Sequence, residues 1–154
     1  TGKVSQVYWM KKDEEDLNYN FFELIFLIKT GDKLSDGTTG YANGDFKLYN
    51  SNDKILVDGA YLKTDKTGNW KIYYYDVDVY TEQDFTNNVG GTEKYFVISS
   101  GQPFSGKFIQ NYDNGKPKYE FKVSEGLRDG KSKYFDESGE TTKTEKYDKG
   151  VLKN

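Results

Sequence analysis

The chain has 154 residues, of which 34% are hydrophobic and 17% aromatic, and its formal net charge is -3. It contains no Cys and no His, which excludes disulfides, thiolate nucleophiles, the usual zinc sites and histidine acid–base chemistry. Tyr (14) and Phe (10) make up nearly half of the apolar side chains, and this aromatic content favours a folded chain over a disordered one. Because Tyr tolerates one wet edge, the composition suits a thin β structure with half-buried faces.

The first 43 residues form the least regular part of the sequence. Val4 to Met10 alternates as a strand does, and Phe21 to Lys29 is the most apolar strand candidate. Its apolar run is interrupted by Glu23 and is too short to cross a bilayer, which takes about 20 residues. We expect degenerate hairpins that cap one end of the fold, as is common in repeat arrays. A leader segment removed before Thr1 is an open interpretation.

From residue 44 onward, glycines recur at a spacing of 24 residues, as from Gly44 to Gly68 and from Gly106 to Gly130. Each pair of opening glycines is accompanied by turn sequences, among them Asp-Asn-Gly-Lys ending at Lys116 and Glu-Ser-Gly ending at Gly139. Asn-Gly and related pairs are typical of tight hairpin turns, which need positive φ. Each unit therefore predicts a strand, a tight turn, a second strand and a looser turn.

Alternation with a period of two divides the predicted strands between two faces of a sheet. One face is mainly apolar and collects Phe46, Leu48, Trp70, Ile72, Tyr74, Phe108, Tyr119, Phe121 and Val123. The other face mixes lysines with an aromatic residue at a recurring offset, namely Tyr49, Tyr73 and Phe135. Such rings either pack on cross-strand neighbours or serve recognition, for which Tyr is well suited.

The second unit loses this register after Tyr75, because residues 76–85 contain no glycine turn. Gly68 and Gly106 are 38 residues apart instead of 24, which indicates an insertion at about 76–103 that lengthens one hairpin. Within it we predict a turn at 87–91 and a strand at 95–98. This insertion is a second place where recognition is expected.

These patterns predict an all-β fold, an elongated antiparallel sheet of successive β-hairpin repeats with no substantial helix. We predict a single continuous domain, with an N-terminal cap at 1–43 and a repeat array at 44–154. The C-terminal strand, Thr141 to Tyr147, is rich in Lys, Glu and Thr, as is typical of a solvated edge strand.

The segments GNWKIYY at 68–74 and YDNGK at 112–116, closed by Gly130 and Gly150, resemble the bacterial variant of the MORN repeat. The resemblance covers residues 44–154 with gaps. It implies an elongated single-layered sheet and a scaffolding, protein-binding or lipid-proximal role, and many bacterial members are labelled as antitoxin-like or immunity-like components. No catalytic residue carries over, because the motif residues are turn glycines and packing aromatics.

Individual positions follow the MORN pattern unevenly. Glu120 and Asp58 fill its acidic position, whereas Thr144 replaces the acidic residue in the last unit, and the second unit lacks the Asn-Gly turn.

Metal and catalytic sites are not predicted. The acidic clusters are Asp13–Asp16 and the set Asp76, Asp78, Glu82 and Asp84. Neither has the spacing of a calcium loop, so we expect solvated acidic loops and no cofactor. No nucleophile, base and orienting group come together in the sequence, so we predict that the chain is not an enzyme. A hydrolase that uses an Asp or Glu pair is kept as a third hypothesis.

The favoured function is a protein-binding or scaffold module that presents an aromatic-rich sheet face, as part of a larger cell-envelope or antitoxin-like complex. The partner-binding candidates are Tyr49, Tyr73, Phe135, Trp70 and Tyr112. The alternative is a glycan- or cell-wall-binding module in which Trp9 or Trp70 stacks on sugar rings.

Other partners are not expected. Nucleic acid is disfavoured because the net charge is negative and Arg occurs once, at Arg128. Membrane association is expected to be indirect at most, and a small-molecule ligand is not expected. The bacterial periplasm or cell envelope is favoured as the location, with the cytoplasm as the alternative.

Overall fold

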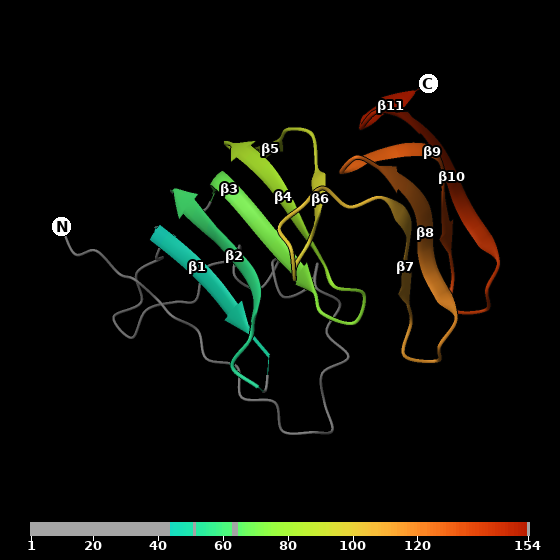
Figure 1. Ribbon diagram of the computed structural model, residues 1–154, viewed down its shortest axis with the longest axis horizontal. Coiled ribbons are helices and arrows are strands. Elements are labelled where there is room, and N and C mark those ends of the chain that lie inside the picture. The colour runs from blue at the N-terminus through green and yellow to red at the C-terminus, as the bar shows by residue number, and fades with distance from the viewer. Residues whose placement is uncertain (1–43, 51, 63–64, 154) are drawn as a thin grey trace, which may run out of the picture. The chain divides into compact units, whose positions relative to one another are not determined.

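The computed structural model describes residues 44–50, 52–62 and 65–153 of the chain (Figure 1). The predicted N-terminal cap at 1–43, which includes Trp9, lies outside the described residues. The described part contains β-strands and no helix, and therefore no helix that could cross a membrane. The strands are β1 (Gly44–Tyr49), β2 (Ile55–Leu62), β3 (Asp65–Tyr74), β4 (Val79–Thr86), β5 (Val89–Gly90), β6 (Lys94–Val97), β7 (Gly106–Asn111), β8 (Pro117–Ser124), β9 (Leu127–Phe135), β10 (Thr141–Asp148) and β11 (Val151–Lys153).

The prediction of an all-β fold of antiparallel hairpins is confirmed, and the strands form two sheets where one continuous sheet was predicted. The first sheet has the order β1-β2-β3-β4-β5, with β6 paired to β4, and the second has the order β11-β10-β9-β8-β7. The chain divides into two compact units. The first unit comprises the described residues up to 72 together with 84–91, and the second comprises 73–83 and 92–153.

Three hairpin turns of the described chain share one geometry. In each, the first residue donates its backbone N–H to the carbonyl of the fifth at 2.8 to 2.9 Å, in the pairs Asn50–Lys54, Tyr112–Lys116 and Asp136–Glu140. The fourth residue has positive φ, at 57° for Asp53, 80° for Gly115 and 91° for Gly139. The turns at 112–116 and 136–140 therefore lie where their turn sequences predicted them, and in the turn that begins at Asn50 an Asp takes the place of the Gly.

The prediction of a solvated edge strand at Thr141 to Tyr147 holds for most of that segment. β10 pairs with β9 on one side, and on the other side β11 covers only Lys146, Tyr147 and Asp148, so among the described residues 141–145 remain at the edge and β11 forms the rest of it. Lys149 and Gly150 connect β10 to β11, with φ values of 46° and 83°. Two successive positive φ values are typical of a two-residue hairpin turn, and Lys at the first position hid this turn in the sequence.

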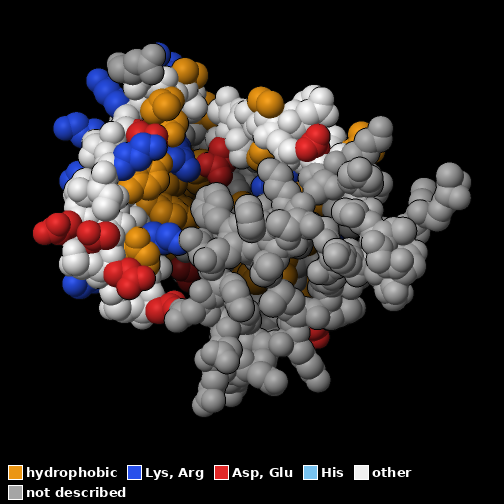
Figure 2. Space-filling model, turned by 180° about the vertical axis from the view of Figure 1, so that it is seen from behind, with side chains coloured by type: hydrophobic (Ala, Val, Ile, Leu, Met, Phe, Trp, Pro, Cys, Tyr) orange, Lys and Arg blue, Asp and Glu red, His pale blue; other side chains and the backbone are white. Residues whose placement is uncertain are grey.

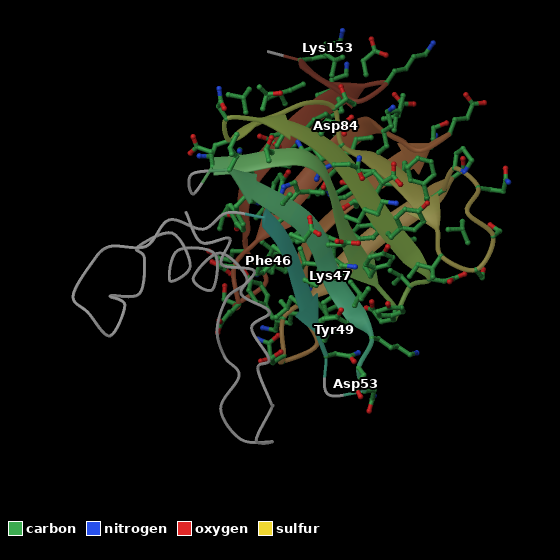
Figure 3. All side chains as sticks on the ribbon, turned by 90° about the vertical axis from the view of Figure 1, so that its left-hand side faces the viewer. Phe46, Lys47, Tyr49, Asp53, Asp84 and Lys153 are labelled. Atoms are coloured by element: carbon green, nitrogen blue, oxygen red, sulfur yellow. The ribbon has the colours of Figure 1, made fainter. Side chains whose placement is uncertain are left out.

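The core of the first unit is built around Trp70. Its ring stacks on Phe46 at 5.7 Å between centroids and meets Tyr61 edge-on at 5.0 Å. The indole N–H donates to the carbonyl oxygens of Ala60 and Thr67, each at 3.2 Å, so its polar atom is satisfied although the residue is 3% exposed. Figure 3 labels Phe46, Lys47 and Tyr49 along β1, where Phe46 is buried and its neighbour Lys47 is half-buried.

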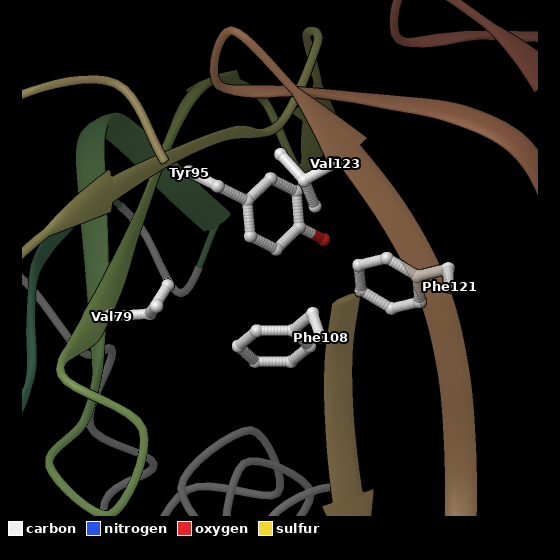
Figure 4. Packing of buried hydrophobic residues seen from close by; sticks show 5 residues of the cluster. All are labelled: Val79, Tyr95, Phe108, Phe121 and Val123. Atoms are coloured by element: carbon white, nitrogen blue, oxygen red, sulfur yellow. The ribbon is translucent and has the colours of Figure 1, made fainter. Parts of the chain in front are cut away.

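The core of the second unit lies between strands of both sheets. Val79 of β4 and Tyr95 of β6 pack with Phe108 of β7 and with Phe121 and Val123 of β8 (Figure 4). Tyr95 meets Phe108 and Phe121 edge-on, each at 5.5 Å between centroids. All five residues are 3% exposed or less. The predicted apolar face of β7 and β8 is therefore the core face.

Gly59→Ala is expected to destabilise the first unit by about 1–3 kcal/mol, because overpacking forces neighbouring groups to move. A Cβ at Gly59 would lie 2.3 Å from the Trp70 ring, which rests on the glycine backbone. The matched control is Gly91→Ala in the same unit, whose Cβ would lie 3.6 Å from the nearest atom and which should change stability by less than about 0.5 kcal/mol. Urea unfolding of both variants measures the difference, and equal stabilities would contradict this packing.

Candidate functional site

Four aromatic side chains of the second unit form a stack along one face of β3, β4 and β6. In order they are Tyr75, Tyr73, Tyr80 and Phe96, and we call them the aromatic ladder. Successive ring centroids are 6.0, 5.5 and 5.3 Å apart, and successive ring planes differ by only 12°, 24° and 21°. The core of the same unit mixes two geometries, since Tyr95 meets Phe108 and Phe121 at 63° and 69° whereas Phe108 and Phe121 stack at 23°.

The register of β4 and β6 places the ladder on the face opposite the core. Thr81 pairs with Tyr95, and these residues are 2% and 1% exposed. The adjacent pair, Tyr80 and Phe96, must emerge on the other face, because successive side chains of a strand alternate. Both are half-buried, and Tyr75 at the end of the ladder is 37% exposed.

Hydrogen bonds connect the turn that contains Tyr75 to the loop after β6. The carboxylate of Asp78 accepts hydrogen bonds from the backbone N–H of Ser99 at 3.1 Å and from its hydroxyl at 2.5 Å. The carbonyl of Asp78 accepts the N–H of Ile98 at 2.9 Å. Asp78 has a φ of 54°, a conformation that Asp tolerates better than most residues. The sequence showed no glycine turn here because this Asp takes the glycine's place.

The five predicted partner-binding residues lie in different surroundings. Tyr73 is part of the ladder, whereas Trp70 is buried in the core of the first unit and has no open ring face. Tyr112 and Phe135 come together, since the Tyr112 hydroxyl donates to the Phe135 carbonyl at 2.7 Å. Tyr49 is half-buried at the end of β1 in the first unit (Figure 3).

Sequence reasoning missed three members of the ladder, Tyr75, Tyr80 and Phe96. Residues 76–85 were predicted as part of an insertion with no strand of their own, so no partner was evident for the strand predicted at 95–98. The pairing of Tyr80 with Phe96 depends on the turn at Asp78 and on β6 pairing with β4, and neither has a local sequence signature.

A second cluster of the same unit surrounds Arg128, the single arginine of the chain. Each guanidinium nitrogen has a partner: Nε donates to the Tyr95 hydroxyl at 2.8 Å, one terminal nitrogen to the Tyr134 hydroxyl at 3.1 Å and the other to Glu93 at 2.9 Å. The guanidinium carbon lies 4.1 Å from the centroid of the Phe121 ring. Planar stacking combined with directed hydrogen bonds is a task for which Lys cannot replace Arg.

Glu145 completes the Arg128 cluster from β10. Its carboxylate accepts the hydroxyls of Tyr134 at 2.8 Å and Tyr147 at 3.2 Å. Hydrogen bonding to Lys143 lowers the pKa of Glu145, and the two tyrosine hydroxyls contribute in the same direction. Burial raises the pKa of Tyr95, and the neighbouring Glu93 raises it further. Because donors and acceptors are matched throughout, we interpret the cluster as a brace between β6, β9 and β10.

In the part of the chain that the structure describes, no group of three or more Asp or Glu side chains is placed to hold a metal ion. Asp78 belongs to the acidic cluster around residue 80, and its carboxylate instead accepts hydrogen bonds from the backbone N–H and the hydroxyl of Ser99.

Comparisons with protein-family profiles, with curated proteins and with solved structures found no match to this chain. The resemblance to the MORN repeat therefore stays a prediction from the sequence. The function has to be argued from the surfaces of this chain itself.

Arg128→Lys is expected to lower the free energy of unfolding by about 2–4 kcal/mol, because it leaves Glu93 and two tyrosine hydroxyls without their directed partner in a largely desolvated site. The Arg128 and Glu93 side chains are only 18% and 25% exposed. Lys133→Ala on the exposed face of β9 is the control and should change stability by less than about 0.5 kcal/mol. Urea unfolding compares the two variants. If Arg128→Lys lowers the free energy of unfolding by less than about 0.5 kcal/mol, its effect is no larger than that of a surface substitution, and the brace is ruled out.

Stability is expected to fall as the pH rises from about 10 to about 12, because unfolded tyrosine titrates near 10. Burial raises the pKa of Tyr61 to about 12, and burial followed by hydrogen bonding to Glu145 raises that of Tyr134 to about 12. Between pH about 10 and about 12 the hydroxyls of Tyr61 and Tyr134 stay protonated in the folded chain and lose their protons in the unfolded chain. The contribution of these protons to the free energy of unfolding is therefore complete below the unfolded pKa of about 10, and it is lost as the pH rises through the folded pKa of about 12. Urea unfolding at stepped alkaline pH tests the slope, and a flat profile would contradict it.

Two conservative variants separate these tyrosines at neutral pH. The Tyr61 hydroxyl is buried and has no hydrogen-bond partner among the described residues, so Tyr61→Phe should leave stability unchanged or raise it by up to about 1 kcal/mol. Tyr134→Phe removes hydrogen bonds to Arg128 and Glu145 and should cost about 1–2 kcal/mol.

Proposed function

We propose that this chain is a non-catalytic protein-binding module whose recognition surface is the aromatic ladder. The observation that carries the proposal is a stack of four partly exposed rings on the face of β3, β4 and β6 that points away from the core. Large aromatic side chains on a surface supply much contact area at low entropic cost, and Tyr is enriched among the residues that dominate binding energies.

The orientation of the rings favours a protein over a glycan as the partner. A sugar ring stacks on an open aromatic face, but the central rings of the ladder, Tyr73 and Tyr80, each have an aromatic neighbour on both sides. Neither of these two rings therefore presents an open face to a sugar ring. This suits an interface of side chains and backbone amides, where an amphipathic ring packs and also forms hydrogen bonds.

The surroundings of the ladder fit an interface with an apolar centre and a polar rim. Val77 is 37% exposed beside Tyr75 in the turn after β3. On the other side, Glu82 and Lys94 form the next cross-strand pair on the same face as Tyr80. The bonds from Ser99 to Asp78 hold the turn in place, so a partner would pay little to order it.

The direct test is affinity capture with chemical cross-linking from extracts of the source organism. The test variant is Tyr73→Thr/Tyr80→Thr/Phe96→Thr, because Thr keeps the strand preference while it removes the rings. The matched control is Leu62→Thr/Val89→Thr/Val151→Thr, which removes strand residues that are 56%, 73% and 55% exposed elsewhere on the surface. We expect one partner, cross-linked beside the ladder, to be captured by the wild type and by the control and to be reduced at least about tenfold with the test variant.

A milder variant keeps the test valid if the triple variant unfolds. Tyr75→Thr changes the most exposed ring of the ladder and should weaken capture without a change in melting temperature. Capture that is unaffected in both ladder variants would disprove the proposal. Binding to a glycan array that depends on the ladder would favour the glycan-binding alternative. The identity of the captured protein decides the narrower proposal of a cell-envelope or antitoxin-like assembly.

A further inference from the structure

A row of lysines crosses the second sheet, one on each strand. Its members are Lys107, Lys122, Lys131, Lys146 and Lys153, and we call them the lysine row. The register pairs Lys107 with Lys122, Lys131 with Lys146, and Lys146 with Lys153. Phe121 of β8 pairs with Ser132 of β9, and both side chains are buried. Lys122 and Lys131 are their neighbours along each strand, so alternation places both lysines on the opposite, outer face.

This row does not serve stability, because like charges that face each other across strands are destabilising. Carboxylates neutralise only its two ends: Lys107 pairs with Glu120 at 2.6 Å, and Lys153 with Asp148 at 3.2 Å. The three central lysines of the row are Lys122, Lys131 and Lys146. They are exposed and form no ion pair with the described residues.

The positive charge of this face is local. Lys133 lies on the same face as the lysine row, since its cross-strand partners Glu120 and Thr144 alternate with the core positions. Alternation also brings Glu120, Asp129 and Asp148 to this face, so six lysines stand against three carboxylates in a chain whose net charge is -3. Figure 2 shows blue side chains along the left-hand edge, where the second sheet lies, with red side chains between them and below them.

We propose that the lysine row binds an acidic polypeptide segment. Adjacent strands are about 4.8 Å apart, so four steps make a row about 19 Å long. An α-helix that carries one carboxylate per turn repeats every 5.4 Å, which flexible lysine side chains can match along this length. Lys is a point charge on a mobile stem, so the row recognises a series of anions and not one planar group.

The face fits a protein anion better than nucleic acid or lipid. Single-strand binders add aromatic platforms to their basic groove, whereas the positions next to the row are Ile109, Glu120, Lys133 and Thr144, and the aromatic Phe135 lies beyond Lys133 at the far end of β9. A uniformly anionic surface would also meet the carboxylates of this face, which a peptide can avoid. Nucleic acid and lipid are therefore alternative outcomes of the test.

The test uses the full chain and a labelled alanine-based helix of about 20 residues with Glu at every fourth position, followed by fluorescence anisotropy. The same peptide with Gln in place of Glu is the ligand control. We expect the Glu peptide to bind at low salt, the Gln peptide to bind at least about tenfold more weakly, and the affinity to fall as salt is added. The variant Lys122→Gln/Lys131→Gln/Lys146→Gln should weaken binding at least about tenfold.

A matched variant removes the same charge elsewhere: Lys54→Gln/Lys94→Gln/Lys149→Gln changes three exposed lysines outside the row. It should change the affinity less than about twofold. The row variant should melt no lower than the wild type, because it relieves repulsion. Equal losses in the two variants, or no binding of the Glu peptide, would overturn the proposal, and binding of labelled oligothymidylate or phosphatidylserine vesicles in its place would assign the row to nucleic acid or lipid.

The lysine row is independent of the aromatic ladder. The ladder variant Tyr73→Thr/Tyr80→Thr/Phe96→Thr should keep its affinity for the Glu peptide, so failure of one proposal leaves the other to be judged on its own result.

Discussion

The packing of aromatic rings against one another is the interaction on which both units depend. Each core is built mainly from Tyr, Phe and Trp, with Val57 in the first unit and Val79 and Val123 in the second, and the rings meet mostly edge to face. Such rings need close backbone support, and the first unit supplies it at Gly59, where the Trp70 ring lies on bare backbone. In the second unit the Phe121 ring is covered by Arg128, whose charge is matched by Glu93 and by tyrosine hydroxyls.

Because successive side chains of a strand point to opposite faces, the core uses one face of a strand and leaves the other face for other roles. In the second unit the core takes one face of β4 and β6 and one face of β7 and β8, and the opposite faces carry the aromatic ladder and the lysine row. Neither surface serves the core. A stack of half-exposed rings leaves apolar area in water, and a row of facing lysines repels itself. The facing lysines are unfavourable in the isolated chain, whereas the stacked rings stabilise their sheet but leave apolar area partly exposed, and each surface would gain energy if a complementary surface covered it.

Local features of the fold could be predicted from the sequence, and non-local ones could not. The turns at 112–116 and 136–140 follow from Gly115 and Gly139, and the core faces of β7 and β8 follow from alternation. The turns at Asp78 and Lys149 were missed because residues other than glycine adopt positive φ there. Those two turns decide where Phe96 pairs with Tyr80 and where Lys153 pairs with Lys146. The aromatic ladder and the lysine row therefore depend on strand pairings that no short sequence segment predicts.

The two surfaces also differ in the physics of association. If both proposals hold, contacts on the ladder would be mainly apolar, would respond little to salt and would act mainly on the rate of dissociation, whereas the lysine row would act over about a Debye length and would speed encounter. They face away from the same core of the second unit, on different sheets, so one small partner cannot cover both without wrapping around that unit. A module with two such surfaces would be able to bring together two partners of different chemistry, as the proposed scaffold role requires.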